Sequence, residues 1–437
     1  MTGFVAMKVI LITLDCVRAD HVGGELTPRL NALAPEFTTF TQAFSQSQNT
    51  LSSHLSMLTS NYLFQHGVYS NFVDKELPSH ALTKRLAERG WRCRAFTSAD
   101  FLARLLGNRI GSDDPRYATG GGGGWKERLK LRRPVNRADS QSTLTLGLKW
   151  LEAQGDSDDV FLWMHLFDAH MVYEAPREFL GEQVRSGKGE CPLSEAIKAR
   201  GWFSPDFPEY RRRLRLEHFP ERYRAAVAYE DAMLGDFIAK LKSGGLWNDV
   251  MLFITADHGE CLLGDHEVYC AHKKLFDTTV HVPLLVKFPA GKHAGRRVDA
   301  IVQHIDIAPT ITAAARFEEP LFMGKNLEKI ASGEDEGHPF AFAEHVENFM
   351  RSARDDRFIY TEIVPGAKNR WSMKMEEGNL FNRDSSPADQ GEEGEARRLK
   401  AALDRLIASR PEVSEAWGEE RAADNATAAR LRELGYL

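Results

Sequence analysis

Residues 248–260 read NDVMLFITADHGE, and this stretch decides the fold. Residues 250–255 form a short apolar run rich in β-formers, as expected of a strand that is buried on both faces of a sheet. The run ends at Asp257-His258-Gly259, where the composition turns polar. Because ligands collect beyond the carboxyl ends of strands in an open parallel sheet, we expect chemistry at this point. A carboxylate beside an imidazole, followed by a glycine at which the backbone can bend, suits a divalent cation.

Two further stretches have a similar design. Residues 8–20, KVILITLDCVRAD, form a second apolar strand that ends on a carboxylate, Asp15. Residues 46–60, QSQNTLSSHLSMLTS, form a hydroxyl-rich turn that runs into a predicted helix. Helical and strand-like segments then alternate along the chain, which is typical of a doubly wound sheet. The sequence therefore predicts an α/β fold with a mostly parallel central sheet flanked by helices.

Taken in chain order, the three stretches resemble the sulfatase family of the alkaline phosphatase superfamily. Members of that family carry an LDTLRAD-like first strand, a nucleophile turn of the type C/S/T-x-P-S-R/H and a later D-H/N-G. Further similar motifs are HGVYSN (66–71), HLFDAHMVY (165–173), HKKLFDTTVHVPLLVKFP (272–289), DIAPTI (306–311) and LRELGYL (431–437). The resemblance implies an alkaline-phosphatase-like fold, with a catalytic α/β domain in residues 1–325 and a smaller α+β subdomain in residues 326–437.

Length and composition exclude several classes of protein. The chain of 437 residues can bury a large core, and its 43% hydrophobic and 27% charged residues are ordinary for a globular protein. A net charge of −6 gives no support to nucleic acid as a partner, and no run of about 18 apolar residues suggests a membrane span. The N-terminal MTGFVAMKVILITLD lacks the basic start and cleavage site of a signal peptide, and five scattered cysteines argue against a disulfide framework. We therefore expect a cytoplasmic location.

Two segments interrupt the alternation of predicted helices and strands. Residues 105–138 contain the run GGGGG at 120–124 and a basic tract. Because that run lacks the Lys-Ser/Thr that follows a phosphate-binding loop, it predicts a flexible insertion. Residues 174–218 are rich in charged and aromatic side chains without sustained periodicity, and they predict a lid or rim over the site.

The resemblance implies that Asp15, Thr50, Asp257 and His258 hold one divalent cation. Carboxylates and an imidazole suit Ca²⁺, Mg²⁺, Mn²⁺ or Zn²⁺. Many sulfatases have a second aspartate ligand directly after the first, where this chain has Cys16. That departure argues against a Ca²⁺ site of the usual sulfatase kind. The set is more similar to that of phosphonate monoester and phosphodiester hydrolases of the same superfamily, which favours Mn²⁺ or Zn²⁺.

Thr50 occupies the position of the family's nucleophile. Secreted and lysosomal sulfatases oxidise a Cys or Ser in C/S-x-P-x-R to formylglycine, whose hydrate attacks sulfur. The matching residues here are Thr50-Leu51-Ser52-Ser53-His54, in which both the Pro and the Arg are missing. Because Thr cannot give that aldehyde by the same oxidation, we expect no formylglycine and attack by the unmodified Thr50 hydroxyl. Ser52 and Ser53 are the alternative nucleophiles.

Thr50 also suits the start of a helix. Threonine is a favoured N-cap, so the alternative is a purely structural role as the cap of a helix over residues 51–59. The two roles are compatible, because the backbone N–H groups at a helix start can receive an anion. A hydroxyl next to a dication can attack at neutral pH, since the charge of the cation lowers the hydroxyl pKa.

Further residues are implied to contact the ester. His170, in the DAH after a predicted strand, matches the family's histidine that stabilises the anion or protonates the leaving oxygen. His165 is the alternative for this role, or else a core residue. His272 and Lys273 both fit the position of a basic residue before the LFD sequence, and either alignment occurs among relatives. Asn71 matches a family asparagine that donates to the non-bridging oxygens.

Together these residues predict a metal-dependent hydrolase of sulfate or phosphate esters of small molecules, in which a threonine hydroxyl attacks in line. The alternatives within the superfamily are a phosphodiesterase or phosphonate monoester hydrolase, and a two-metal phosphatase or mutase. In the two-metal alternative, Asp168, His170 and His272 would hold the second cation. The alternative from a different class is a non-catalytic metal-binding protein, which the departures at Cys16 and Ser52 favour.

Overall fold

The computed structural model describes most of the chain. The described residues are 6–75, 77–99, 102, 139–171, 173, 175–186, 216–262, 272, 274–345, 350–364, 366, 379–384, 386–389, 391–409 and 420–422. The predicted insertion at 105–138, most of the predicted rim at 174–218, Lys273 and the terminal motif at 431–437 lie outside them.

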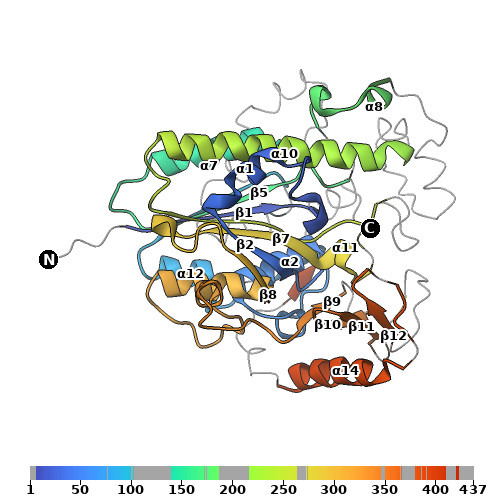
Figure 1. Cartoon of the computed structure of the whole chain (residues 1–437). Coiled ribbons are helices and arrows are strands. Elements are labelled where there is room, and N and C mark those ends of the chain that lie inside the picture. The colour runs from blue at the N-terminus through green and yellow to red at the C-terminus, as the bar shows by residue number, and fades with distance from the viewer. Residues whose placement is uncertain are drawn as a thin grey trace.

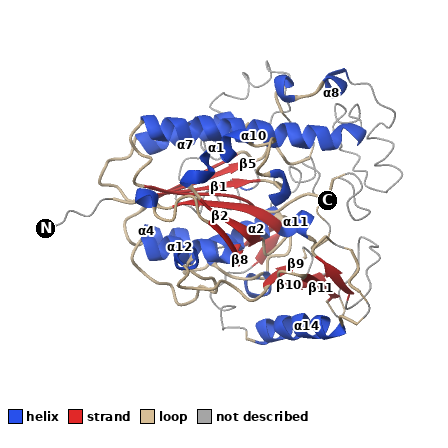
Figure 2. Cartoon of the chain, in the orientation of Figure 1, coloured by secondary structure: helices blue, strands red, loops and turns tan. Residues whose placement is uncertain are grey.

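A seven-stranded sheet forms the centre of the protein, with the strand order β4-β5-β1-β6-β7-β2-β8. Its strands are β1 (Lys8–Leu14), β2 (Thr38–Phe44), β4 (Arg92–Thr97), β5 (Val160–Leu166), β6 (Val250–Ala256), β7 (His281–Lys287) and β8 (Arg297–Gln303). Neighbouring strands are parallel from β4 to β6 and between β2 and β8, whereas β7 is antiparallel to β6 and β2. A mostly parallel sheet flanked by helices confirms the predicted α/β fold (Figure 2).

The central strands β5, β1 and β6 end level with one another. Every residue of these strands is buried, because helices cover both faces of the sheet (Figure 1). Leu14 pairs with Leu166 on one side and with Ala256 on the other. Asp15 and Asp257, which follow β1 and β6, therefore emerge side by side at the carboxyl edge of the sheet.

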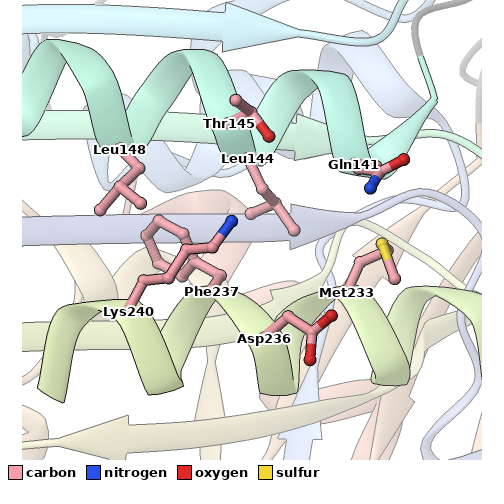
Figure 3. Close-up of a pocket in the computed structure, with 8 residues that line it drawn as sticks. All are labelled: Gln141, Leu144, Thr145, Leu148, Met233, Asp236, Phe237 and Lys240. Carbon is pink, nitrogen blue, oxygen red and sulfur yellow. The ribbon is translucent and has the colours of Figure 1, made fainter. Parts of the chain in front are cut away.

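Helices lie in one layer on each face of the sheet (Figure 1). The first layer contains α1 (Pro28–Leu33), α7 (Ser140–Glu152) and α10 (Phe219–Ser243), and the second contains α2 (Thr50–Thr59), α4 (Leu82–Ala87) and α12 (Ile307–Ala314). A small pocket of about 30 Å³ lies between α7 and α10 and is lined by four residues of each helix (Figure 3). None of the predicted site residues lines this pocket.

A second, antiparallel sheet has the strand order β12-β11-β10-β9. Its strands are β9 (Ala341–Glu344), β10 (Met350–Arg354), β11 (Phe358–Ile363) and β12 (Asn379–Asn382). The helix α14 (Glu393–Ala408) packs on this sheet, where Leu399 and Leu403 join an apolar cluster with Phe358 and Tyr360. The division of the chain after residue 325 stays a prediction.

The remaining described elements are short. The helices are α3 (Leu63–His66), α8 (Glu182–Ser186), α11 (Asp277–Val280) and α13 (Leu327–Ser332), and the 3₁₀ helices are η1 (Ala19–His21), η2 (Ala34–Glu36), η4 (Arg177–Phe179), η6 (Leu216–His218), η8 (Pro289–Gly291) and η9 (His304–Asp306). A third sheet pairs β3 (Val73–Lys75) with β13 (Glu420–Ala422). Within the described ranges, no helix combines the length and the apolar character that crossing a membrane requires.

Candidate active site

The four residues predicted to hold the cation lie together at the carboxyl edge of the sheet. Asp15 follows β1, Asp257 and His258 follow β6, and Thr50 is the first residue of α2. One ligand atom from each of Asp15, Asp257 and His258 lies within 4.8 Å of the other two. The Thr50 hydroxyl lies 3.5 Å from Asp15 Oδ2 and 3.3 Å from His258 Nε2. All four side chains are buried.

This set of donors fits a divalent cation. Asp257 Oδ1 accepts hydrogen bonds from the backbone N–H groups of Cys16 and His258, at 3.2 and 2.8 Å, which fixes the carboxylate. Asp257 Oδ2 is buried and accepts no hydrogen bond from the described residues, and His258 Nε2 is 3.5 Å away. Such an oxygen beside a second carboxylate carries a charge that a cation would balance. The residues that would hold the cation are Asp15, Thr50, Asp257 and His258.

Asn49, rather than Thr50, is the N-cap of α2. The Asn49 side chain accepts a hydrogen bond from Ser52 N, so the interpretation of Thr50 as the cap is wrong. The N–H groups of residues 51–53 are also engaged, because they donate in turn to Asn71 Oδ1, Asn49 Oδ1 and Asn49 O. These three N–H groups are therefore not available to receive an anion. The hydroxyl of Thr50 instead faces the candidate ligands.

The alternative nucleophiles form hydrogen bonds within the fold. Ser52 Oγ and Ser53 Oγ donate to the backbone carbonyls of Val68 and Asp257, at 2.7 and 2.6 Å. Asn71 Oδ1 accepts a hydrogen bond from the N–H group of Leu51 at the start of α2, whereas the buried Asn71 Nδ2 makes no hydrogen bond to the described residues. The amide Nδ2 can therefore donate to a bound ester, which is the predicted role of Asn71.

Two buried histidines lie behind Asp15 and Thr50. His165 Nε2 is 3.1 Å from Asp15 Oδ2, and His54 Nδ1 is 2.7 Å from Thr50 O. The other ring nitrogens both approach Thr13 Oγ1, at 2.9 Å from His165 and 3.0 Å from His54. Burial lowers the pKa of His165 to about 4 and the pKa of His54 to about 3. Because both nitrogens of His165 contact the protein, its geometry suits the orientation of Asp15 rather than the predicted contact with substrate.

His170 and His272 lie close to the candidate cation site. The His170 ring stacks on Phe167 with centroids 4.4 Å apart, and its Nδ1 lies 2.8 Å from a backbone carbonyl. The His272 ring lies 4.5 Å from the His258 ring and 6.3 Å from the His170 ring, measured between centroids. The sequence thus identified two imidazoles that gather around the same place. Lys273 lies outside the described residues.

Cys16 entered the prediction only as a departure from the family pattern, but it lies inside the site. Its thiol is 3.0 Å from Asp15 Oδ1. Burial, followed by the charge of Asp15, raises the pKa of the thiol well above its usual value. Its place directly after Asp15 is the signal that could have marked it as a site residue.

Gly259 and Glu260 complete the turn after β6. A Cβ atom at Gly259 would lie 2.2 Å from the carbonyl oxygen of Thr278, so this close approach of two backbones requires a glycine. The φ of Gly259 is not among the positive values of the described residues, so the close approach to Thr278 rather than a left-handed backbone requires the glycine. Burial raises the pKa of Glu260 to about 7. Sequence reasoning missed Glu260, although it is part of the motif DHGE.

Glu230 of α10 is a second buried carboxyl that the sequence did not reveal. It accepts hydrogen bonds from the N–H groups of Asp168 and Ala169, at 3.0 and 3.2 Å, and so holds the turn that carries His170. The Asp168 side chain accepts a hydrogen bond from Ser140 N at 3.0 Å. Within the described residues, Asp168 belongs to no group of side chains close enough to share a cation. The predicted two-metal site with Asp168 therefore gains no support.

The fold and the site together place a buried group of candidate cation ligands at the carboxyl edge of a mostly parallel sheet. The sequence model of the Sulfatase family matches residues 8–317. The chain therefore belongs to the sulfatase family, as the motifs predicted.

Curated relatives match parts of the chain. The uncharacterized sulfatase YidJ of Escherichia coli is 27% identical over 190 residues, which cover 41% of this chain and 36% of that protein. Arylsulfatase K of Gallus gallus is 36% identical over 176 residues, which cover 40% and 28%. The ulvan-active sulfatase of Formosa agariphila is 24% identical over 375 residues, which cover 78% and 68%. The chain thus spans about a third of the length of the first two relatives.

Solved structures share the fold over almost the whole chain. The phosphonate monoester hydrolase from Silicibacter pomeroyi has a TM-score of 0.68 at 18% identity, covering 93% of this chain and 96% of that one. BT4656, solved in complex with its substrate D-glucosamine-2-N,6-O-disulfate, has a TM-score of 0.69 at 14% identity, covering 94% and 99%. At these identities the likeness shows the fold alone.

Proposed function

We propose that the protein hydrolyses sulfate or phosphate esters of small molecules. The nucleophile is the unmodified hydroxyl of Thr50, and one divalent cation is held by Asp15, Thr50, Asp257 and His258. The observation that carries this proposal is the position of Thr50 Oγ1, which lies within 3.5 Å of Asp15 Oδ2 and of His258 Nε2 in a buried site. When bound, the cation would polarise a non-bridging oxygen of the ester and lower the pKa of the nucleophilic hydroxyl.

The side chains around Thr50 support this role. His258 Nδ1 lies 2.9 Å from Gly259 O, which favours the tautomer that carries its proton on Nδ1. The lone pair of His258 is then on Nε2, the atom that lies towards Thr50 and that a cation ligand must use. His165 Nε2 donates to Asp15 Oδ2 and so orients that carboxylate.

Hydrogen-bond donors must stabilise the negative charge that develops on the oxygens of the ester during the reaction. The N–H groups of residues 51–53 donate to Asn71 and Asn49, so they are not available to the ester. Asn71 Nδ2, His170 and His272 are the donors proposed to act in their place, together with Lys273 if its side chain reaches the ester. Of these groups, His170 or His272 is proposed to protonate the leaving oxygen.

Phosphodiesters and phosphonate monoesters form the second candidate substrate class, and Thr50 itself favours them. The hydrate of formylglycine has two hydroxyls on one carbon, so one of them can expel the group that the other carries. Thr50 has a single hydroxyl, so water must attack the sulfur or phosphorus of the covalent intermediate, break its bond to Thr50 Oγ1 and regenerate the Thr50 hydroxyl. His170 or His272 would take the proton of that water. Related phosphoryl-transfer enzymes of the superfamily use threonine at this position, which is why Thr50 favours phosphorus esters as the second class.

A substrate panel tests the proposal. The purified protein is treated with a chelator, reloaded with Mn²⁺, Zn²⁺, Ca²⁺ or Mg²⁺, and assayed with p-nitrophenyl sulfate, p-nitrophenyl phosphate, bis-p-nitrophenyl phosphate and an aryl phosphonate monoester. We expect cleavage of at least one ester, its loss with the chelator and its return with a cation. If no ester is cleaved while metal is bound stoichiometrically, the protein is a metal-binding protein without this activity.

Elemental analysis of the active protein separates the one-metal proposal from the two-metal alternative. We expect close to one cation per chain, whereas two would favour the phosphatase or mutase.

The cytoplasmic location stays a prediction.

A further inference from the structure

The thiol of Cys16 lies among the candidate ligands of the cation. Its Sγ atom is 3.0 Å from Asp15 Oδ1. In the described residues, three groups of His, Cys, Asp and Glu side chains have ligand atoms within 4.8 Å of one another, and two of these groups contain Cys16. One joins Cys16 to His258 and His272, and the other joins it to Asp15 and His170. The Cys16 sulfur therefore lies close both to the predicted ligands Asp15 and His258 and to His170 and His272.

The backbone of Cys16 is held in an unusual conformation. Its φ is 63°, in the left-handed region that a residue with a Cβ atom adopts only at a cost in free energy. The N–H group donates to Asp257 Oδ1 at 3.2 Å, and the carbonyl accepts from the Tyr223 hydroxyl at 2.8 Å. The same hydroxyl accepts from Arg18 N at 3.0 Å. Contacts from β6 and α10 therefore fix the residue while its fully buried side chain stays beside Asp15.

An independent observation points to a ligand in this place. Asp257 Oδ2 is buried and accepts no hydrogen bond from any residue that the structure describes. The other oxygen of this carboxylate, Asp257 Oδ1, accepts a hydrogen bond from the backbone N–H group of Cys16. A cation next to Oδ2 would therefore lie beside the segment that carries the thiol.

The chemistry of the donors distinguishes between cations. Ca²⁺ and Mg²⁺ prefer oxygen ligands, whereas a thiolate and imidazoles select Zn²⁺ and the transition metals. A site that offers one sulfur, one or more imidazole nitrogens and carboxylate oxygens therefore belongs to the zinc type.

We propose that Cys16 is a direct thiolate ligand of the active-site cation, and that this ligand makes the site selective for zinc-type ions over Ca²⁺ and Mg²⁺. The proposal rests on the cation site of the proposed function and adds the sulfur that replaces the aspartate of many sulfatases.

Cobalt substitution tests this proposal without reference to activity. Co²⁺ bound by a thiolate gives a near-ultraviolet charge-transfer band that oxygen and nitrogen ligands do not give. We expect the band in the full-length protein loaded with Co²⁺, its loss in Cys16→Ser, and its retention in Cys93→Ser. Cys93 is the matched control because its Sγ lies near the carbonyls of Thr83 and Trp91, outside the site. Competition titrations should show that Cys16→Ser binds Zn²⁺ more weakly by more than about 100-fold, because the loss of an outer-shell partner alone costs roughly 10–100-fold.

The Cys16→Asp variant supplies a second readout. It restores the carboxylate that many sulfatases have at this position, and we expect it to shift the preference from Zn²⁺ towards Ca²⁺. Circular dichroism checks that both variants fold, and the band of the unmodified protein remains decisive if they do not. Bound Co²⁺ without the band, or a band that persists in Cys16→Ser, would overturn the proposal but leave the proposed function intact. A protein that binds no Co²⁺ would overturn both.

Discussion

His170 and His272 are imidazoles close to the four-residue cation set, and each has a ligand atom within 4.8 Å of members of that set. Replacing either by Ala is expected to lower turnover by about 10²–10³-fold, the loss that follows removal of an oxyanion donor. Steady-state kinetics on the preferred aryl ester measures this effect. His293→Ala is the control, because His293 lies near Glu328 and outside the site. If His272→Ala is fully active and Lys273→Ala is not, the basic residue of the family pattern is Lys273. Full activity in His170→Ala, His272→Ala and Lys273→Ala would contradict the prediction.

The sequence identified Asp15, Thr50, Asp257 and His258 because each follows a strand or starts a helix in a motif of fixed order. Cys16 is different. Side chains of an extended strand point alternately to opposite sides, and the left-handed φ of Cys16 ends that alternation directly after β1. No pattern of residue types indicates such an angle at a cysteine, so the sequence shows that Cys16 follows Asp15 but not that its thiol turns towards the ligands.

At the scale of elements, α10 supports the site through Glu230. Burial, followed by the charge of Asp168, raises the pKa of Glu230 well above its usual value of 4.5. With the pKa raised in the folded state, its contribution to stability is complete below pH 4.5 and is lost as the pH rises through the folded-state pKa. Glu230→Gln keeps an oxygen for the N–H groups of Asp168 and Ala169 but cannot ionise.

We therefore expect Glu230→Gln to lose less stability than the unmodified protein when the pH is raised from below 4.5. Thermal unfolding recorded across that pH range measures the difference. Parallel stability curves for the two proteins would show that Glu230 does not carry this pH dependence.

The turn after β6 depends on the glycine at position 259. In Gly259→Ala the new Cβ would lie 2.2 Å from Thr278 O, so one of the two backbones must move. We expect a loss of about 1–3 kcal/mol in the free energy of unfolding and weaker cation binding by the neighbouring His258. Urea denaturation and metal titration measure the two effects. Gly394→Ala in α14, where no atom lies within 4 Å, is the control and should stabilise the helix by about 0.5–1 kcal/mol.

Some elements could be predicted and others could not. The strands β1, β5 and β6 are continuous apolar runs, which is the pattern of strands covered on both faces. The edge strand β8 was missed, because exposed charged residues alternate along its first half. The helix α1 ends at Leu33, because Pro35 in the following η2 cannot donate the hydrogen bond of a continuing helix.

At the scale of the whole molecule, Asp277 joins the small sheet to the central one. It starts α11, next to β7, and its carboxylate lies 2.7 Å from Arg354 of β10 and 2.6 Å from Arg383. Arg354 is fully buried, and its guanidinium lies over the ring of Phe44 in β2. The small sheet is thus joined through one carboxylate to the segment that leads into β7.

Asp277→Ala would leave a buried guanidinium without its partner. We expect the free energy of unfolding to fall by about 3 kcal/mol, because removing one member of a buried ion pair is strongly destabilising. Denaturant unfolding measures the loss. Glu393→Ala, which removes the exposed partner of Arg397, is the control and should leave the stability unchanged. Equal losses in the two variants would mean that Asp277 does not hold the sheets together.

Turnover of the preferred aryl ester by Thr50→Ala, measured at saturating cation, tests the proposed mechanism most directly. The matched control is Ser52→Ala, since Ser52 Oγ is bonded to the carbonyl of Val68 in the same turn. Circular dichroism must show that both variants fold, and the intact mass of the unmodified protein must match its sequence without an aldehyde. We predict that Thr50→Ala loses turnover by on the order of 10⁴-fold or more while Ser52→Ala remains active. Undiminished turnover by Thr50→Ala would contradict the assignment of Thr50 as the nucleophile.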